Sequence, residues 1–243
     1  MKTRGILTSI LAATVACGFA RAETITQTLT GAVFAPGTDT LETFTFNQFD
    51  TLDGTRELIS VTVNLTHYSW GGYFWIDNDG EELVSFTAQH GTGARLAAKG
   101  YVLPGDVVDP IYAIITTGKT PITVPADDGD GPDYQQGGPD NVRLDGPEDR
   151  EHAIVASSSG TLTSNLDAYI GTGTLDIEYY SSQASHHNAE GPATYTGANA
   201  YAQGIVTITY EWAWVPEPNS AALLALGCMV LGLRRRPSVG KRA

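Results

Sequence analysis

Cysteine and basic residues are both scarce in the central part of this chain. The two cysteines, Cys17 and Cys228, each lie inside an apolar terminal segment, so the region between them holds no thiol. This excludes a disulfide framework, thiol catalysis and cysteine-ligated zinc there. Residues 23–217 carry six basic residues against 27 acidic ones, a net charge of −21. Such a charge repels phosphate backbones, so we expect no nucleic-acid partner, whereas divalent cations and basic partners are compatible with it.

Motifs for catalysis are lacking as well. The sequence contains no Gly-x-Ser-x-Gly, no His-Glu-x-x-His and no phosphate-binding loop. Carboxylates are so abundant that a glycosidase pair cannot be inferred from spacing. We therefore expect a protein that is not an enzyme, and keep a secreted hydrolase as the third and weakest alternative.

Helical periodicity is almost absent from residues 23–214, where apolar and polar residues alternate. Between Leu58 and His67 the alternation places Ile59, Val61, Val63 and Leu65 on one face. One buried and one solvated face per strand is typical of antiparallel sheets packed on each other. The sequence predicts one all-β domain, a jelly-roll-like antiparallel β-sandwich, with further strands at 25–29, 41–46, 73–76, 83–87, 111–116, 154–158, 175–180 and 206–214.

The first 22 residues have the features of a secretory signal peptide. Two basic residues precede an apolar run from Ile6 to Phe19, which predicts a signal helix. Ala20 and Ala22 then supply the small side chains that a signal peptidase pocket accepts. We expect cleavage after Ala22, and hence an exported protein.

The last part of the chain, residues 215–243, has three parts in a fixed order. Pro216, Glu217 and Pro218 come first, an apolar run at about 219–233 follows, and the arginines Arg234, Arg235 and Arg236 end that run. Counted from Val215, a helix of 19 residues would be about 28 Å long, close to the ~30 Å hydrocarbon core. The sequence predicts a transmembrane helix that the arginines stop on the cytoplasmic side.

The Pro-Glu-Pro, the apolar helix and the arginine cluster together resemble the PEP-CTERM sorting signal of Gram-negative bacteria. The resemblance covers about the last 25 residues. It implies recognition by an exosortase-like membrane enzyme, with Pro216, Glu217 and Pro218 as its substrate motif. It also implies a link to exopolysaccharide or biofilm matrix.

The body of the chain resembles the choice-of-anchor E family of exported bacterial proteins. The similarity lies in three segments: Leu41-Glu42-Thr43-Phe44-Thr45-Phe46-Asn47-Gln48-Phe49-Asp50, then Leu58-Ile59-Ser60-Val61-Thr62-Val63 after a glycine turn, and the closing Val206-Thr207-Ile208-Thr209-Tyr210-Glu211-Trp212. It implies a β domain shared among proteins with different anchors, and no activity.

An acidic segment at 125–151 departs from the strand pattern. It holds nine acidic residues, four prolines and little apolar content, so we expect a surface loop insertion. Asp128, Asp130 and Asp133 are spaced so that one tight loop could direct several oxygens at a Ca²⁺ ion, the one cofactor that the sequence suggests. The alternative is a solvated acidic loop. A second group, at 77–82, predicts first a hairpin turn.

Aromatic residues are densest at 70–75. Trp70, Tyr73 and Trp75 could stack on the apolar faces of sugars if they are exposed on a sheet, or fill the core if they are not.

The leading expectation is an exported structural or interaction protein of the cell surface or extracellular matrix, initially anchored in the inner membrane. The alternative is a carbohydrate-binding module for matrix polysaccharide.

Overall fold

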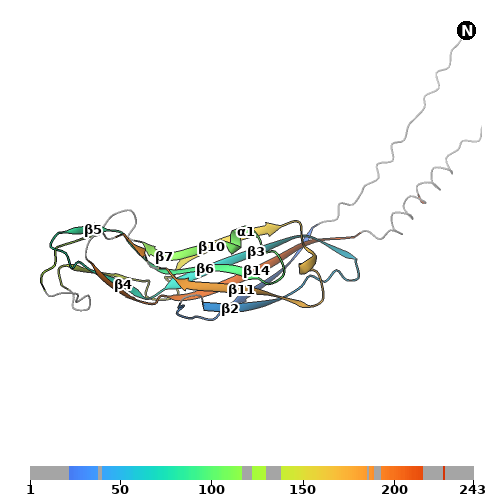
Figure 1. Cartoon of the computed structure of the whole chain (residues 1–243). Coiled ribbons are helices and arrows are strands. Elements are labelled where there is room, and N and C mark those ends of the chain that lie inside the picture. The colour runs from blue at the N-terminus through green and yellow to red at the C-terminus, as the bar shows by residue number, and fades with distance from the viewer. Residues whose placement is uncertain are drawn as a thin grey trace, which may run out of the picture.

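The computed structural model describes residues 22–37, 40–116, 122–129, 138–184, 186–188, 193–215 and 227 (Figure 1). Most of the signal peptide, with Ala20, and most of the sorting tail therefore lie outside the described residues. The same holds for the Pro216–Pro218 motif and the Arg234–Arg236 cluster. Within the described ranges, no helix has the length and apolarity to cross a membrane.

The first sheet contains four antiparallel strands in the order β1-β14-β3-β10. Their bounds are Glu23–Thr30 for β1, Tyr201–Trp214 for β14, Arg56–Trp70 for β3 and Ile154–Leu162 for β10. Threonines face each other across the solvent side, with Oγ1–Oγ1 distances of 3.1 Å for Thr26–Thr209 and 3.0 Å for Thr28–Thr207. Such cross-strand pairs of β-branched residues stabilise a half-buried sheet.

The second sheet places β6 and β11 at its centre, in the order β12-β6-β11-β2, and β7 also pairs with β6. The strands are β2 (Thr40–Asn47), β6 (Ala88–Ala98), β7 (Ile111–Thr116), β11 (Thr174–Gln183) and β12 (His186–His187). Two short helices lie in the connections: α1 (Gly105–Val108) and the 3₁₀ helix η1 (Asp167–Tyr169).

The two sheets face each other over one shared core. Val63 and Leu65 of β3 and Ile208 of β14 come from the first sheet, and Phe46 of β2 and Leu96 of β6 come from the second; all are at most 1% exposed. The alternation of apolar and polar residues along the strands therefore predicted this packing of two sheets correctly. The chain is an all-β protein of antiparallel sheets packed as a sandwich.

The prediction that Ile59 of β3 faces the core is wrong. The pairing of β3 with β14 shifts register between Glu211, opposite Ser60, and Trp212, opposite Leu58. The residue between them on β3, Ile59, is left out of the pairing and is 40% exposed, while Leu58 is buried. A bulge adds one residue to one strand and so reverses which side chains face inward beyond it.

A second, smaller layer lies at one end of the sandwich. A three-stranded sheet has the order β13-β4-β9, formed by β4 (Tyr73–Asp77), β9 (Asn141–Asp145) and β13 (Thr194–Ala198). A two-stranded sheet pairs β5 (Val84–Phe86) with β8 (Ile122–Val124). These strands share a small core with the first residue of β6, Ala88. The other buried members of this core are Phe74, Ile76, Phe86 and Val124.

This layer corrects the expectation of a loop insertion at 125–151. Residues 141–145 form β9, which pairs with β4 along its whole length, and Asp140 just before it is 1% exposed. Val142 and Leu144 pack against the small core. The strand forms because these two apolar residues lie opposite Ile76 and Phe74 of β4 and extend the apolar face that packs on the small core.

The molecule is elongated, and its two ends differ. The first strand begins and β14 ends together, since Glu23 pairs with Trp212. In Figure 1 the labelled strands β4 and β5 lie at the opposite end of the sandwich. The second layer is therefore the end far from the points where the chain enters and leaves the domain.

Candidate functional site

Three loops meet at this far end, and Asn78 joins them. The loop after β4 contains Asn78, whose backbone N–H donates to the carbonyl oxygen of Asp140 at 3.0 Å. Its side-chain amide donates to the carbonyl oxygens of Glu82 at 2.9 Å and Pro125 at 2.5 Å. Asn78 is 2% exposed, so these hydrogen bonds replace its water shell. The two acidic stretches that the sequence showed separately, at 77–82 and from 125 onward, are thus neighbours.

The same loops bring three carboxylates together. One oxygen from each of Asp127, Asp128 and Asp140 lies within 4.8 Å of the others. A backbone hydrogen bond joins two of these loops, because Asp127 N–H donates to the Gly80 carbonyl oxygen at 2.8 Å. Within one loop, Gly129 N–H donates to Asp127 Oδ1 at 2.8 Å. We call Asp127, Asp128 and Asp140 the carboxylate cluster.

Asp140 is the buried member of the carboxylate cluster. Its Oδ2 accepts the backbone N–H of Asp128 at 3.0 Å, whereas its Oδ1 is buried and accepts no hydrogen bond from the described residues. A Cβ placed on Gly138 would lie 2.6 Å from Asp140 Oδ1 and 3.5 Å from Asp128 Oδ2, so both oxygens lie beside the same point of the backbone. Burying an ionised carboxylate oxygen without a partner is unfavourable.

The carboxylate cluster overlaps the predicted metal site only in part. Asp128 lies in it, while Asp130 and Asp133 lie outside the described residues. Sequence reasoning missed Asp140, which is twelve residues beyond Asp128. Asp140 is the residue just before β9. It reaches the cluster because the pairing of β9 with β4 places it beside Asn78. A Gly-Pro-Asp turn before two alternating apolar residues was the one sign of it in the sequence.

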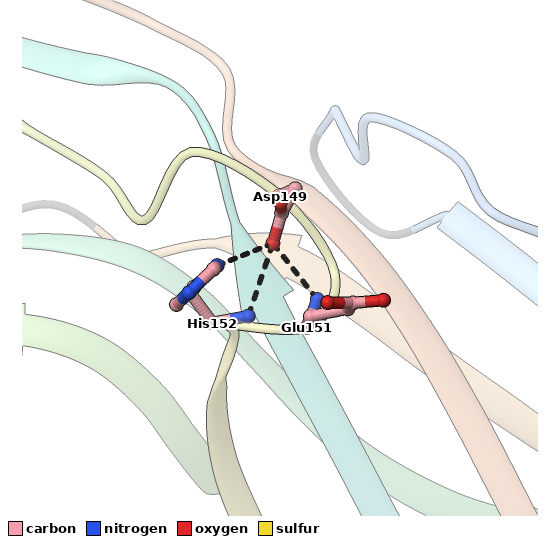
Figure 2. A network of polar contacts seen from close by, with 3 residues as sticks. All are labelled: Asp149, Glu151 and His152. Atoms are coloured by element: carbon pink, nitrogen blue, oxygen red, sulfur yellow. Dashed lines mark hydrogen bonds and ion pairs between the residues drawn. The ribbon is translucent and has the colours of Figure 1, made fainter.

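The end of the acidic segment is a compact turn that leads into β10. Asp149 Oδ1 accepts the backbone N–H groups of Glu151 at 3.0 Å and His152 at 3.1 Å, and lies 2.7 Å from His152 Nδ1 (Figure 2). These contacts hold the pKa of Asp149 below its usual value, the side-chain hydrogen bond with His152 being the largest cause. All three side chains are exposed, so these contacts define a surface turn.

The aromatic residues proposed for sugar contact divide into two environments. Trp70 is 8% exposed and its ring lies 6.0 Å from that of Tyr201, so its faces are not open to a ligand, which corrects that part of the expectation. Tyr73 and Trp75 are half-buried and lie on one face of β4. The Arg143 guanidinium covers both, at 4.4 Å from the Tyr73 ring centre and 5.8 Å from that of Trp75.

A hollow of about 440 Å³ on the outer face of the second sheet also contains two carboxylates, Asp176 and Glu178. Glu178 forms an ion pair with Lys99 at 3.0 Å, and the hydrogen bond from Lys99 is the main reason that the pKa of Glu178 lies below its usual value. A general acid needs the opposite shift. This pair therefore gives the hydrolase alternative no support.

The fold and this site define an all-β sandwich protein with a carboxylate cluster at one end. No family model and no curated protein matches the chain. Among solved structures it is similar to one of Desmodium yellow mottle tymovirus, at 11% identity over 90% of this chain and 95% of that chain, with a TM-score of 0.19. It is also similar to the T13 IBDV viral particle, at 12% identity over 91% of this chain and 45% of that chain, with a TM-score of 0.19.

Proposed function

We propose that this protein is an exported structural or interaction protein of the cell surface or extracellular matrix. In this proposal residues 1–22 direct export, and residues 215–243 serve as a PEP-CTERM-like sorting signal with a transmembrane helix at about 219–233. An exosortase-like enzyme recognises Pro216, Glu217 and Pro218, and the product joins the exopolysaccharide or biofilm matrix. The thiol-free, acidic body is suited to an extracellular setting.

The observation that carries the proposal is that the two ends of the elongated domain differ. β1 begins and β14 ends at one end of the sandwich, and the second layer with its three acidic loops lies at the other (Figure 1). At ~3.3 Å per residue the 14 residues of β14 alone cover about 46 Å. A domain built in this way and attached through the segment after Val215 would hold its far loops several nanometres from the membrane.

We further infer that the sandwich is a jelly roll. The first sheet takes the strands β1, β3, β10 and β14. The second sheet takes the strands between them in the chain, β2, β6, β7 and β11. This gives β1-β14-β3-β10 facing β7-β6-β11-β2, which is the strand order of two Greek keys folded into a jelly roll. Jelly rolls host unrelated functions. The proposed function therefore rests on the two terminal segments of the chain and on the difference between the two ends of the domain, not on the fold.

Mass spectrometry of the protein isolated from its native envelope tests the proposal. We expect a mature N-terminus at Glu23 and a C-terminus near Pro216–Pro218 that carries a new adduct. The variant Glu217→Ala should keep the signal cleavage but retain the full tail. An intact, unprocessed chain recovered from the cytoplasm would refute export and sorting together.

A carbohydrate-binding function is the second candidate, and one observation favours it. Tyr73 and Trp75 have half-buried rings on one face of β4, and the Arg143 guanidinium lies over both rings and offers hydrogen-bond donors at that surface. The Nε of Arg143 lies 2.5 Å from Asp145 Oδ1. A combination of aromatic rings with a planar hydrogen-bond donor suits a sugar ring. Trp70 has no part in this surface because it is buried.

A further inference from the structure

We propose that the carboxylate cluster of Asp127, Asp128 and Asp140 binds a calcium ion at the far end of the domain. The proposal does not depend on how the protein is sorted. Ca²⁺ prefers oxygen ligands and takes six to eight of them, with water and backbone carbonyls completing the shell. Three carboxylate oxygens within 4.8 Å of one another supply the charged part of such a shell.

Asp140 distinguishes this cluster from the other acidic groups on the surface. It is 1% exposed, and its Oδ1 is buried without a hydrogen-bond donor among the described residues. The neighbouring N–H of Asp128 is already used by Oδ2. None of the ion pairs between described residues involves Asp127 or Asp140. A cation between Asp140 Oδ1 and the Asp128 carboxylate would provide the missing partner for the buried charge.

The backbone around the carboxylate cluster is already organised. Asp128 is linked to Asp140 through its own N–H, and Asp127 is linked to the loop after β4 through the Gly80 carbonyl oxygen. Asn78 ties this loop to both of the others. A ligand set that is held in place before binding loses less conformational entropy when the ion arrives.

The arrangement favours Ca²⁺ over Mg²⁺. The ligands come from two loops and differ in exposure, with Asp127 and Asp128 exposed and Asp140 buried. Mg²⁺ demands a near-ideal octahedron and gives up water reluctantly, whereas Ca²⁺ accepts irregular shells. Sites with few charged ligands in extracellular proteins bind Ca²⁺ with dissociation constants of about 10⁻⁴–10⁻³ M.

Calorimetric titration of the chelator-treated full chain with calcium chloride tests the proposal. We expect one saturable site with a dissociation constant in the range just given. Asp127→Asn and Asp128→Asn should each weaken it at least about tenfold, because each removes a charged ligand. Magnesium chloride in place of calcium chloride should bind at least about tenfold more weakly. At a hundredfold excess of Ca²⁺ over the dissociation constant, the Tm should rise by roughly 5–10 °C.

Asp140→Asn supplies a readout that a purely structural role would not produce. It keeps an acceptor oxygen for the Asp128 N–H but removes the buried charge. We therefore expect its calcium-free Tm to equal or exceed that of the parent, while its Tm no longer responds to Ca²⁺.

Glu81→Gln is the matched control, since it removes one exposed acidic group from the adjoining loop and should leave the calcium affinity within about twofold. Absence of saturable calcium binding by the parent chain would overturn the proposal. So would equal losses in Asp128→Asn and Glu81→Gln, or equal affinities for Ca²⁺ and Mg²⁺, because these results describe a diffuse acidic surface. Asp127 is exposed, so its variant keeps the test valid even if Asp140→Asn fails to fold.

Discussion

Acidification should destabilise this protein, and the buried histidine His67 should account for a large part of the loss. This residue of β3 is 0% exposed and joins the two sheets: its Nδ1 lies 2.8 Å from the Tyr179 hydroxyl on β11, and its Nε2 lies 2.8 Å from Thr92 Oγ1 on β6. Burial lowers the pKa of His67 from 6.5 to about 4, and a hydrogen bond that the ring can donate to the backbone of Thr92 offsets only part of this effect. The imidazole is therefore neutral in the folded protein at pH values where it would be charged in water.

The sign and size of the effect follow from that difference. Below pH 6.5 the unfolded chain binds a proton at His67 that the folded chain does not, so the free energy of unfolding falls as the pH falls. The loss begins near pH 6.5 and is complete near pH 4. The difference between 6.5 and about 4, at 1.36 kcal/mol for each tenfold change in proton affinity, corresponds to a loss of roughly 3 kcal/mol in the free energy of unfolding. Above pH 7 the residue contributes no pH dependence.

Urea unfolding at half-unit steps from pH 4 to pH 8 measures this loss, with His67→Gln as the comparison. His90, which is also buried, and the carboxylates Asp149 and Glu178 have lowered pKa values and also destabilise the protein as the pH falls, but they do so in both chains. The difference between the two curves therefore isolates His67. We expect His67→Gln to be less stable at pH 7 and to show a flatter dependence from pH 6.5 to pH 4. Parallel curves would refute the reasoning.

Three further predictions concern packing and ligand contact. Gly204→Ala places a Cβ 2.8 Å from the buried Tyr179 ring and should cost about 1–3 kcal/mol in urea unfolding, whereas Gly105→Ala, with open space around it, should be nearly neutral; equal effects would contradict the packing argument. Trp70→Ala should lower stability by about 3–5 kcal/mol because the ring is buried, and should not act through a lost sugar contact. If the domain binds glycans, Trp75→Ala should abolish binding on a glycan array with the Tm unchanged, and retained binding would remove Trp75 from that surface.

Regular alternation made the main strands predictable. The strand expected at 111–116 is β7, and the one expected at 206–214 is the second half of β14, with Val206, Ile208 and Tyr210 buried as their spacing indicates. Period-two patterns are reliable in these strands because each of them covers one side of a shared core. Trp214 continues the pattern but is 49% exposed, since the strand extends beyond that core.

The central strand β6 could not be predicted, although it pairs with β7, β11 and β12. It contains Gly91 and Gly93 among small and polar residues, which locally favour a turn. The neighbouring strand β7 explains why these two residues are glycines. A Cβ on Gly91 would lie 2.5 Å from the Ala113 carbonyl oxygen, and one on Gly93 would lie 2.6 Å from the Tyr112 ring. Glycine is needed where neighbouring strands approach so closely, and no local pattern reports that approach.

By itself, the sequence determined the all-β class, the positions of most strands and the acidic, thiol-free character of the body, because these depend on composition and on contacts between near neighbours. Only the tertiary structure decided which side chains became partners. It buried Trp70, left Ile59 exposed through a bulge, and brought Asp140 to Asp128 through a strand that the sequence presented as a loop. Such pairings depend on strand register and on how sheets stack, and these are set by the free energy of the whole core and not by any one segment.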